Sequence, residues 1–233
     1  MASNLLKIYG FPLSQPYRSV IMLCKAASVP FQPVLIDALK GETRKPEFRN
    51  ISPTGLVPVI DDNGYVLHES AAILSYICES RKLKDWLPDD AKERGNINAW
   101  MHWHHANTRK GTLKVLRQML FPKKGADPAV EAADLEKSLK EMYKSIGLIE
   151  SHLTQSKSKF LVGSKHPTIA DLLIIPELDQ LSEKGFNLAN IKQFPAVCNY
   201  INTIEAEVSS YKEVFQAVAD ARRDGYNGRP LHK

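Results

Sequence analysis

The sequence has few cysteines, with only three among 233 residues. They stand far apart, at positions 24, 78 and 198, and no Cys-x-x-Cys pair occurs. This spacing argues against a dithiol redox centre and against a zinc ribbon, because both need closely spaced cysteines. Cys24 and Cys78 fall on the apolar faces of predicted helices. We therefore expect both thiols to be buried and inert.

The sequence also lacks a long apolar run. No segment approaches the roughly 20 apolar residues that a helix needs to cross a bilayer. Residues 1–7 do not combine a basic start with a long apolar stretch, so they indicate no secretory signal. The final residues, 230–233, match neither a peroxisomal nor an endoplasmic-reticulum retention signal. We expect a cytoplasmic protein with no membrane partner.

Nor is there a concentrated basic stripe. The formal net charge is +5, but the lysines and arginines are scattered and are not interleaved with stacking aromatics. This distribution disfavours a nucleic-acid partner. A basic protein that attracts a small anionic ligand accounts for the charge equally well.

The first eighty residues alternate between strand-like and helix-like patterns. Apolar runs at residues 5–9, 31–36, 57–60 and 65–67 predict strands, and the Asp-Asp-Asn-Gly turn between the last two is a strong hairpin signal. Helical spacing of apolar residues follows Pro16 and Ser70. The resulting order, β-α-β, a short irregular piece and then β-β-α, is that of a thioredoxin-like domain.

The composition changes after Arg81. Residues 82–90 predict a linker, and helical patterns follow at about residues 91–121, 128–155, 169–183, 195–206 and 211–222. Thr168 and Asp171 form a capping-box-like helix start, to which we assign stability and no catalytic role. The predicted fold class is α/β plus all-α, with a thioredoxin-like domain in residues 1–81 and a helical-bundle domain in residues 91–233.

Two segments of the first domain carry groups suited to a small acidic peptide. If the bond before Pro58 is cis, the N–H and C=O of Val57 point outward and can pair with an extended ligand. Ser70 at a helix start offers a hydroxyl, free N–H groups and a positive dipole end to a carboxylate. Glu69 offers a negative charge to an ammonium group. A ligand with an amino group, a carboxylate and a central peptide fits both segments.

Four sequence motifs occur in the order found in cytosolic glutathione transferases. They are Ser14-Gln-Pro16 with Arg18, Ser52-Pro-x-Gly-x-Val-Pro58, Glu69-Ser70 and Thr168-Ile-Ala-Asp171. Each motif alone is weak, but all four in register over most of the chain resemble this family. The segment Leu13-Ser-Gln-Pro-Tyr-Arg18 is most similar to the theta class.

The resemblance implies that the first domain binds glutathione as a cosubstrate and that the helical domain binds a hydrophobic electrophile. A free thiol has a pKa of about 8.5, so such a site must stabilise the thiolate. Lowering that pKa by two units corresponds to about 2.7 kcal/mol. We assign Ser14, at a strand-to-helix junction, as the hydrogen-bond donor to sulfur. The alternative is that its hydroxyl only caps the helix.

Two neighbours of Ser14 have auxiliary assignments. Tyr9 is the rival donor, because other classes of the family use a tyrosine near the end of the first strand. The Ser-Gln-Pro motif favours Ser14 and leaves Tyr9 to core packing. Arg18 either holds the loop or an acidic partner near the ligand, or it forms a surface ion pair.

The resemblance also implies which residues contact each part of glutathione. Its γ-glutamyl end meets Glu69 and Ser70, and its cysteinyl amide pairs with Val57 beside Pro58. Its glycine carboxylate needs a cation, and relatives place a histidine for it.

Thr43 and Arg44 occupy the matching positions of this chain, so the usual histidine is absent. Arg44 can compensate with a bidentate contact, or it is a solvated side chain. Leu56 stands where relatives commonly carry glutamine or lysine. We expect glutathione to be held more weakly or differently at this end.

The segment Trp100-Met-His-Trp-His-His105 is rich in histidine and tryptophan. Only His102 and His105 have near-neighbour helical spacing and no third ligand is evident, so we expect no metal. We assign Trp103, Arg109 and Met119 to the electrophile site, with core packing as the alternative for Trp103 and Met119.

The expected function is a glutathione transferase that joins the glutathione thiolate to electrophilic carbon, with glutathione-dependent hydroperoxide reduction as a second activity. The absence of a Ser-Ser-Cys motif disfavours the isomerase relatives, and the lack of a cysteine at position 14 disfavours disulfide exchange. The alternative is a non-catalytic binding or interaction module of the same fold. Relatives are homodimers, so we expect a homodimer.

Overall fold

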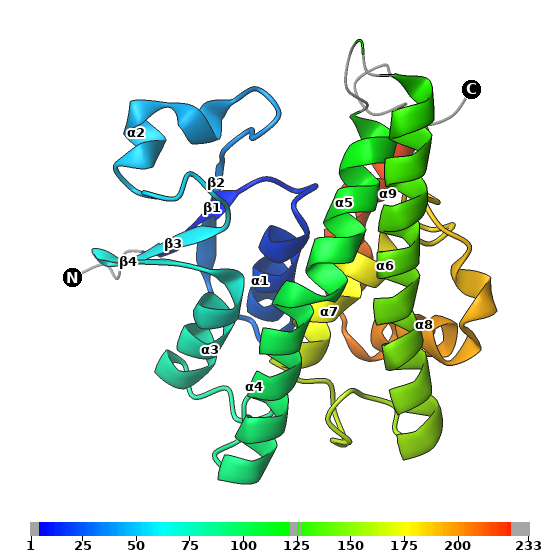
Figure 1. Ribbon diagram of the computed structural model, residues 1–233. Coiled ribbons are helices and arrows are strands. Elements are labelled where there is room, and N and C mark those ends of the chain that lie inside the picture. Colours follow the sequence, from blue (N-terminus) through cyan, green and yellow to red (C-terminus); the bar gives the residue numbers. More distant parts are fainter. Residues whose placement is uncertain (1–4, 122–124, 126, 225–233) are drawn as a thin grey trace.

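The computed structural model describes residues 5–121, 125 and 127–224. A sheet with flanking helices forms one half of the molecule and a bundle of helices forms the other (Figure 1). Predictions drawn from residues 1–4 and 230–233 concern positions outside this described part.

A four-stranded mixed sheet organises the N-terminal half. Its strands are Leu6–Gly10 (β1), Phe31–Leu35 (β2), Val59–Asp62 (β3) and Tyr65–His68 (β4). Their order is β2-β1-β3-β4, with β1 parallel to β2 and antiparallel to β3, and with β3 antiparallel to β4. Helices α1 (Gln15–Ala26) and α3 (Ser70–Ser80) contact each other, and α1 lies between the sheet and the second half (Figure 1). This is the thioredoxin-like arrangement that the sequence predicts.

The β3–β4 hairpin forms as predicted. Asn63 and Gly64 both have positive φ, 55° and 92°, as a two-residue hairpin turn of this type requires. Asp62 is buried and accepts hydrogen bonds from the Tyr76 hydroxyl and the Arg81 guanidinium, each at 2.7 Å, and from the Asn63 amide at 3.0 Å. These bonds tie the hairpin to α3 and to the residue that follows it.

The second half is built from helices. They are Ala91–Ala106 (α4), Thr108–Leu120 (α5), Pro128–Ser156 (α6), Ile169–Asp179 (α7), Pro195–Glu207 (α8) and Tyr211–Arg223 (α9). Shorter pieces are η1 (Glu42–Arg44), α2 (Pro46–Arg49) and η2 (Ile191–Gln193). None of the helices in the described residues combines the length and the hydropathy that a membrane span requires.

The prediction of one helix over residues 91–121 is wrong. Asn107 separates α4 from α5 with φ −116° and ψ −86°, outside the helical region. Its side-chain amide donates to the Trp103 carbonyl at 2.9 Å. Such side-chain bonding competes with the helical backbone. Apolar residues at helical spacing continue on both sides of Asn107, so the sequence pattern predicts one unbroken helix here.

Helix α7 forms the centre of the molecule, where it contacts α1, α3, α4, α5 and α8. Every residue of α7 is buried. The predicted capping box is confirmed, because the Thr168 N–H donates to the Asp171 carboxylate at 2.7 Å. The Leu161 N–H and the Tyr200 hydroxyl donate to the same carboxylate, at 3.0 and 2.9 Å.

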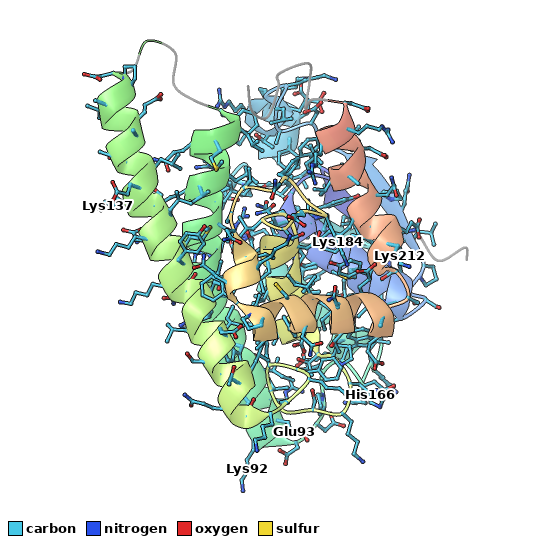
Figure 2. The ribbon with its side chains drawn as sticks, turned by 90° about the vertical axis from the view of Figure 1, so that its right-hand side faces the viewer. Lys92, Glu93, Lys137, His166, Lys184 and Lys212 are labelled. Atoms are coloured by element: carbon cyan, nitrogen blue, oxygen red, sulfur yellow. The ribbon has the colours of Figure 1, made fainter. Side chains whose placement is uncertain are left out.

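The surface of the helical half carries dispersed lysines. Lys92, Lys137, Lys184 and Lys212, labelled in Figure 2, come from α4, α6, the segment after α7 and α9. Lys184 forms an ion pair with Glu205. The scattered basic charge of the sequence is therefore spread over separate elements of this face.

Helix α3 ends at Ser80 and α4 begins at Ala91. Our division into residues 1–81, 82–90 and 91–233 remains a proposal.

Cys24 and Cys78 are free and buried as expected, and burial raises the pKa of each thiol to about 12.

Candidate functional site

The first half of the candidate site lies just before β3. The Val57–Pro58 bond is cis, Pro58 is buried and Val57 is half-buried. In the described part of the chain, neither the N–H nor the C=O of Val57 has a hydrogen-bond partner. Both groups remain available to a ligand. The buried Ser52 hydroxyl supports this loop by donating to the Leu56 carbonyl at 3.0 Å.

The second half is the start of α3. Glu69 precedes the helix with φ 69° and ψ 110°, a backbone conformation that residues other than glycine rarely adopt. Such outliers cost about 1–3 kcal/mol and cluster at binding sites. The Glu69 carboxylate is exposed and lies 4.0 Å from His68 Nδ1. Ser70 begins the helix, where free N–H groups and the positive dipole end favour a carboxylate.

A cavity of about 140 Å³ joins these two halves at the junction of the domains. Its lining from the first domain is Pro16, Thr54, Leu56, Val57, Pro58, His68, Glu69, Ser70 and Ala71. Its lining from the helical domain is Met101, His104, His105, Arg109 and Leu173. The structure thus brings together Val57, Pro58, Glu69, Ser70 and Arg109 among the residues selected from the sequence.

Ser14 stands immediately before α1, with φ −75° and ψ 119°. Its hydroxyl makes no capping hydrogen bond, so the alternative that it only caps the helix is not what the structure shows. The side chain is half-buried and does not line the cavity, although Pro16, two residues on, does. Within the residues that the structure describes, the Ser14 hydroxyl makes no hydrogen bond, so it can donate to a ligand atom near the helix start.

Of the two auxiliary residues, Tyr9 lies outside the core in which we expected it, whereas Arg18 holds the loop, which is one of its expected roles. Tyr9 alternates with the buried Ile8 and Gly10, so it lies half-buried on the other face of the sheet, outside the core and the cavity. Arg18 is fully buried and forms no surface ion pair. It donates to the Pro12 carbonyl at 3.2 Å and thereby holds the loop before Ser14. Burial lowers the pKa of Arg18 to about 10, although nearby carboxylates oppose this.

Thr43 and Arg44 lie in η1, and neither lines the cavity. In the described part of the chain, the exposed Arg44 side chain has no hydrogen-bond or ion-pair partner. Leu56 is 61% exposed and lines the cavity, where its side chain offers apolar surface only.

Two of the three residues assigned to the electrophile site do not line this cavity. Trp103 packs against the core and meets Trp100 edge-on, with ring centroids 5.3 Å apart. Met119 lines a separate cavity of about 810 Å³, together with Leu139 and Tyr143 of α6. The structure thus favours the packing alternative for Trp103 and places Met119 away from the junction.

The sequence reading missed Glu177, which lies behind the cavity wall. It is 1% exposed, and its carboxylate accepts from Arg109 Nη1 at 3.0 Å and from Thr112 Oγ1 at 2.5 Å. Burial alone would raise the pKa of Glu177, but Arg109, His104 and Thr112 outweigh it, so its pKa lies below the ordinary value. An ionisable residue inside the apolar run of residues 172–178 was the available signal.

The fold defines a two-domain protein with a thioredoxin-like half, a helical half and a cavity at their junction. Residues 8–85 match the family model for the glutathione S-transferase N-terminal domain, and residues 108–207 match that for the C-terminal domain. The chain belongs to the glutathione S-transferase family.

Relatives of the chain include theta-class members. It is 38% identical to glutathione S-transferase T1 of Arabidopsis thaliana over 76% of this chain and 72% of that protein. It is 31% identical to glutathione S-transferase theta-3 of Mus musculus over 93% of this chain and 90% of that protein. Glutathione S-transferase T3 of Arabidopsis thaliana is longer, since the 36% identical region spans 38% of its length.

Solved structures agree on the fold. Poplar glutathione transferase F1 superposes with a TM-score of 0.79 at 28% identity, over 93% of this chain and 99% of that one. The apo form of human glutathione-S-transferase T1-1 gives a TM-score of 0.82 at 24% identity, over 97% of this chain and 92% of that one.

Proposed function

We propose that this protein is a theta-type glutathione transferase that joins the thiolate of glutathione to electrophilic carbon. The observation that carries the proposal is the cavity at the domain junction. It unites the Glu69–Ser70 helix start with Val57, whose N–H and C=O have no hydrogen-bond partner among the described residues. A γ-glutamyl peptide supplies an amino group, a carboxylate and a backbone amide for these three positions.

Ser14 is our candidate for the group that activates the sulfur. Its hydroxyl is not used by the helix that it precedes. A donor of this kind, with the N-terminal end of α1 beside it, stabilises a thiolate over a thiol. The bound thiolate then attacks the electrophile from a fixed orientation.

The glycine carboxylate of glutathione is assigned to Arg44, with Thr43 beside it. The Arg44 guanidinium, which has no partner in the part of the chain that the structure describes, is available for this contact, and the Leu56 side chain offers no polar group. At the electrophile side we retain Arg109, which lines the cavity. Trp103 and Met119 are not retained, because they lie elsewhere.

Hydroperoxide reduction is the second activity in this proposal. The thiolate attacks the terminal peroxide oxygen, the O–O bond breaks, and the alkoxide leaves and takes up a proton to become the alcohol. A second glutathione then converts the resulting sulfenic acid to glutathione disulfide and water. The same activated thiolate serves both reactions, so both should depend on Ser14.

A homodimer and a cytoplasmic location complete the proposal. Three free cysteines suit a reducing compartment. Sedimentation at several protein concentrations tests the dimer, and a fluorescent fusion tests the location. A monomeric mass throughout, or a secreted fusion, contradicts the respective statement.

Kinetics with glutathione and an alkyl halide, and with glutathione and cumene hydroperoxide, test the function. We expect turnover that saturates in both substrates and a kcat/KM that is lower by roughly 10–150-fold in Ser14→Ala. The competing function is a glutathione-binding module without catalysis. The exposed Leu56 favours it, because an apolar side chain stands where relatives carry a polar contact to glutathione. If calorimetry shows glutathione binding while both proteins turn over neither electrophile, the module is the correct description.

A further inference from the structure

A buried carboxylate in the central helix links both sides of the candidate site. Glu177 of α7 accepts on Oε1 from Arg109 Nη1 at 3.0 Å and on Oε2 from Thr112 Oγ1 at 2.5 Å. Gln180 Nε2 also lies 3.4 Å from Oε2. Surrounding cations and donors keep the pKa of Glu177 below its ordinary value despite burial, so the group is ionised at neutral pH.

The first arm of this network leads to the cavity wall. Arg109 lines the cavity, and in the described part of the chain its side chain donates only to Glu177. A free arginine side chain samples many rotamers, and an ion pair to a fixed carboxylate removes most of them. The remaining guanidinium donors are then available to the cavity. His104 lines the same cavity. Its Nε2 is buried 3.7 Å from Glu177 Oε1 and has no hydrogen-bond partner among residues 5–121, 125 and 127–224.

The second arm leads to the loop that carries Ser14. Gln180 Oε1 accepts from Arg18 Nη2 at 3.4 Å. Arg18 Nη1 donates to the Pro12 carbonyl at 3.2 Å, two residues before Ser14. A hydrogen-bonded path therefore runs from Arg109 through α7 to the start of α1.

We propose that Glu177 is a positioning residue for the conjugation reaction. It fixes Arg109 in the wall of the cavity and, through Gln180 and Arg18, orients the loop that presents Ser14. This inference rests on the proposed function. The competing role is a purely structural ion pair that holds α5 against α7, as buried pairs often do.

Glu177→Gln tests the inference, because the amide keeps the shape and one acceptor but removes the charge. Glu150→Gln is the matched control. The Glu150 carboxylate accepts from the N–H groups of Ala196 and Val197 at 3.1 and 2.8 Å, and Glu150 does not line the cavity. Both variants are compared by urea unfolding, so that kinetics are measured only where the protein is folded.

Three readouts separate positioning from structure. For Glu177→Gln we expect kcat with an alkyl halide to fall about tenfold, as for loss of one charge-assisted interaction. The Kd of glutathione should stay within about twofold. The pKa of the bound glutathione thiol, followed by ultraviolet absorbance, should rise by about 1. Glu150→Gln should shift unfolding and leave all three unchanged.

The double variant Glu177→Gln with Arg109→Gln adds a second check. If Glu177 acts through Arg109, the double variant loses no more kcat than the worse single variant. Unchanged kcat and thiol pKa in folded Glu177→Gln overturn the inference, as does full additivity in the double variant. If wild type binds glutathione but conjugates nothing, the proposed function fails and the thiol pKa decides the positioning role. If wild type does not bind glutathione, both fail.

Discussion

Replacing Ser14 by alanine separates activation of the sulfur from stability of the fold. The Ser14 hydroxyl makes no capping bond in α1, so its removal should change the free energy of unfolding by less than about 0.5 kcal/mol. A hydrogen bond from a hydroxyl to a charged sulfur is worth about 1.5–3 kcal/mol. At about 1.4 kcal/mol per factor of ten, the loss in kcat/KM is roughly 10–150-fold.

The pH dependence of the conjugation rate shows whether Ser14→Ala raises or lowers the pKa of the bound glutathione thiol. The reactive species is the thiolate, so the rate rises with pH through the pKa of bound glutathione. Losing a donor that stabilises the thiolate raises that pKa, by about 1–2 for the free energies above. The deficit of Ser14→Ala should therefore be largest at low pH and shrink above the pKa of the free thiol.

The assay is conjugation to an alkyl halide across this pH range, with urea unfolding in parallel. Ser19→Ala is the control, because the buried Ser19 hydroxyl donates to the Gln15 carbonyl within the same helix, at 3.2 Å. It should lose about 1 kcal/mol of stability and keep its rate. Wild-type rates in Ser14→Ala, with most of the rate lost in Tyr9→Phe, would refute the assignment of the donor.

The remaining predictions concern ligand affinity, helix packing and pH stability. Arg44→Ala should raise the Kd of glutathione about tenfold in calorimetry, and an unchanged Kd removes it from the glycine subsite. Gly111→Ala should lower the free energy of unfolding by about 1–2 kcal/mol, because its Cβ would lie 2.9 Å from Met142 Cα. At Gly147 an added Cβ would lie 3.8 Å from the nearest atom, on Phe194, so Gly147→Ala should instead raise the free energy of unfolding by about 0.5–1 kcal/mol. If both glycine substitutions change the free energy of unfolding in the same direction, the packing argument is contradicted. Asp62→Asn should cost about 1–3 kcal/mol near neutral pH. Burial raises the pKa of this carboxyl, but bonds from a tyrosine, an arginine and an asparagine lower it overall. Its contribution is therefore complete above the unfolded pKa and lost as pH falls below about 4, so a deficit that persists in acid contradicts the reasoning.

Local chemistry made much of the fold predictable. The Asn63–Gly64 turn and the capping box at Thr168 each depend on residues within a few positions of one another. Val57–Pro58 and Glu69–Ser70 are two such local features, and the fold places both in the lining of one cavity, while their role in ligand binding stays a prediction.

Long-range partners were not predictable in the same way. Arg109 and Glu177 are 68 positions apart, and their pairing depends on how α5 packs against α7. The break at Asn107 has no proline or glycine to mark it, so the course of α5 could not be read from periodicity. Met119, assigned to the electrophile site, consequently lies in another cavity.

The most direct test of the central claim is the pKa of the glutathione thiol when it is bound to the wild-type protein. Titration of the ultraviolet absorbance of the thiolate, with and without saturating protein, measures it. We predict a value well below the roughly 8.5 of the free thiol. If glutathione binds and its thiol titrates as it does in free solution, the site does not activate the sulfur and the account is contradicted.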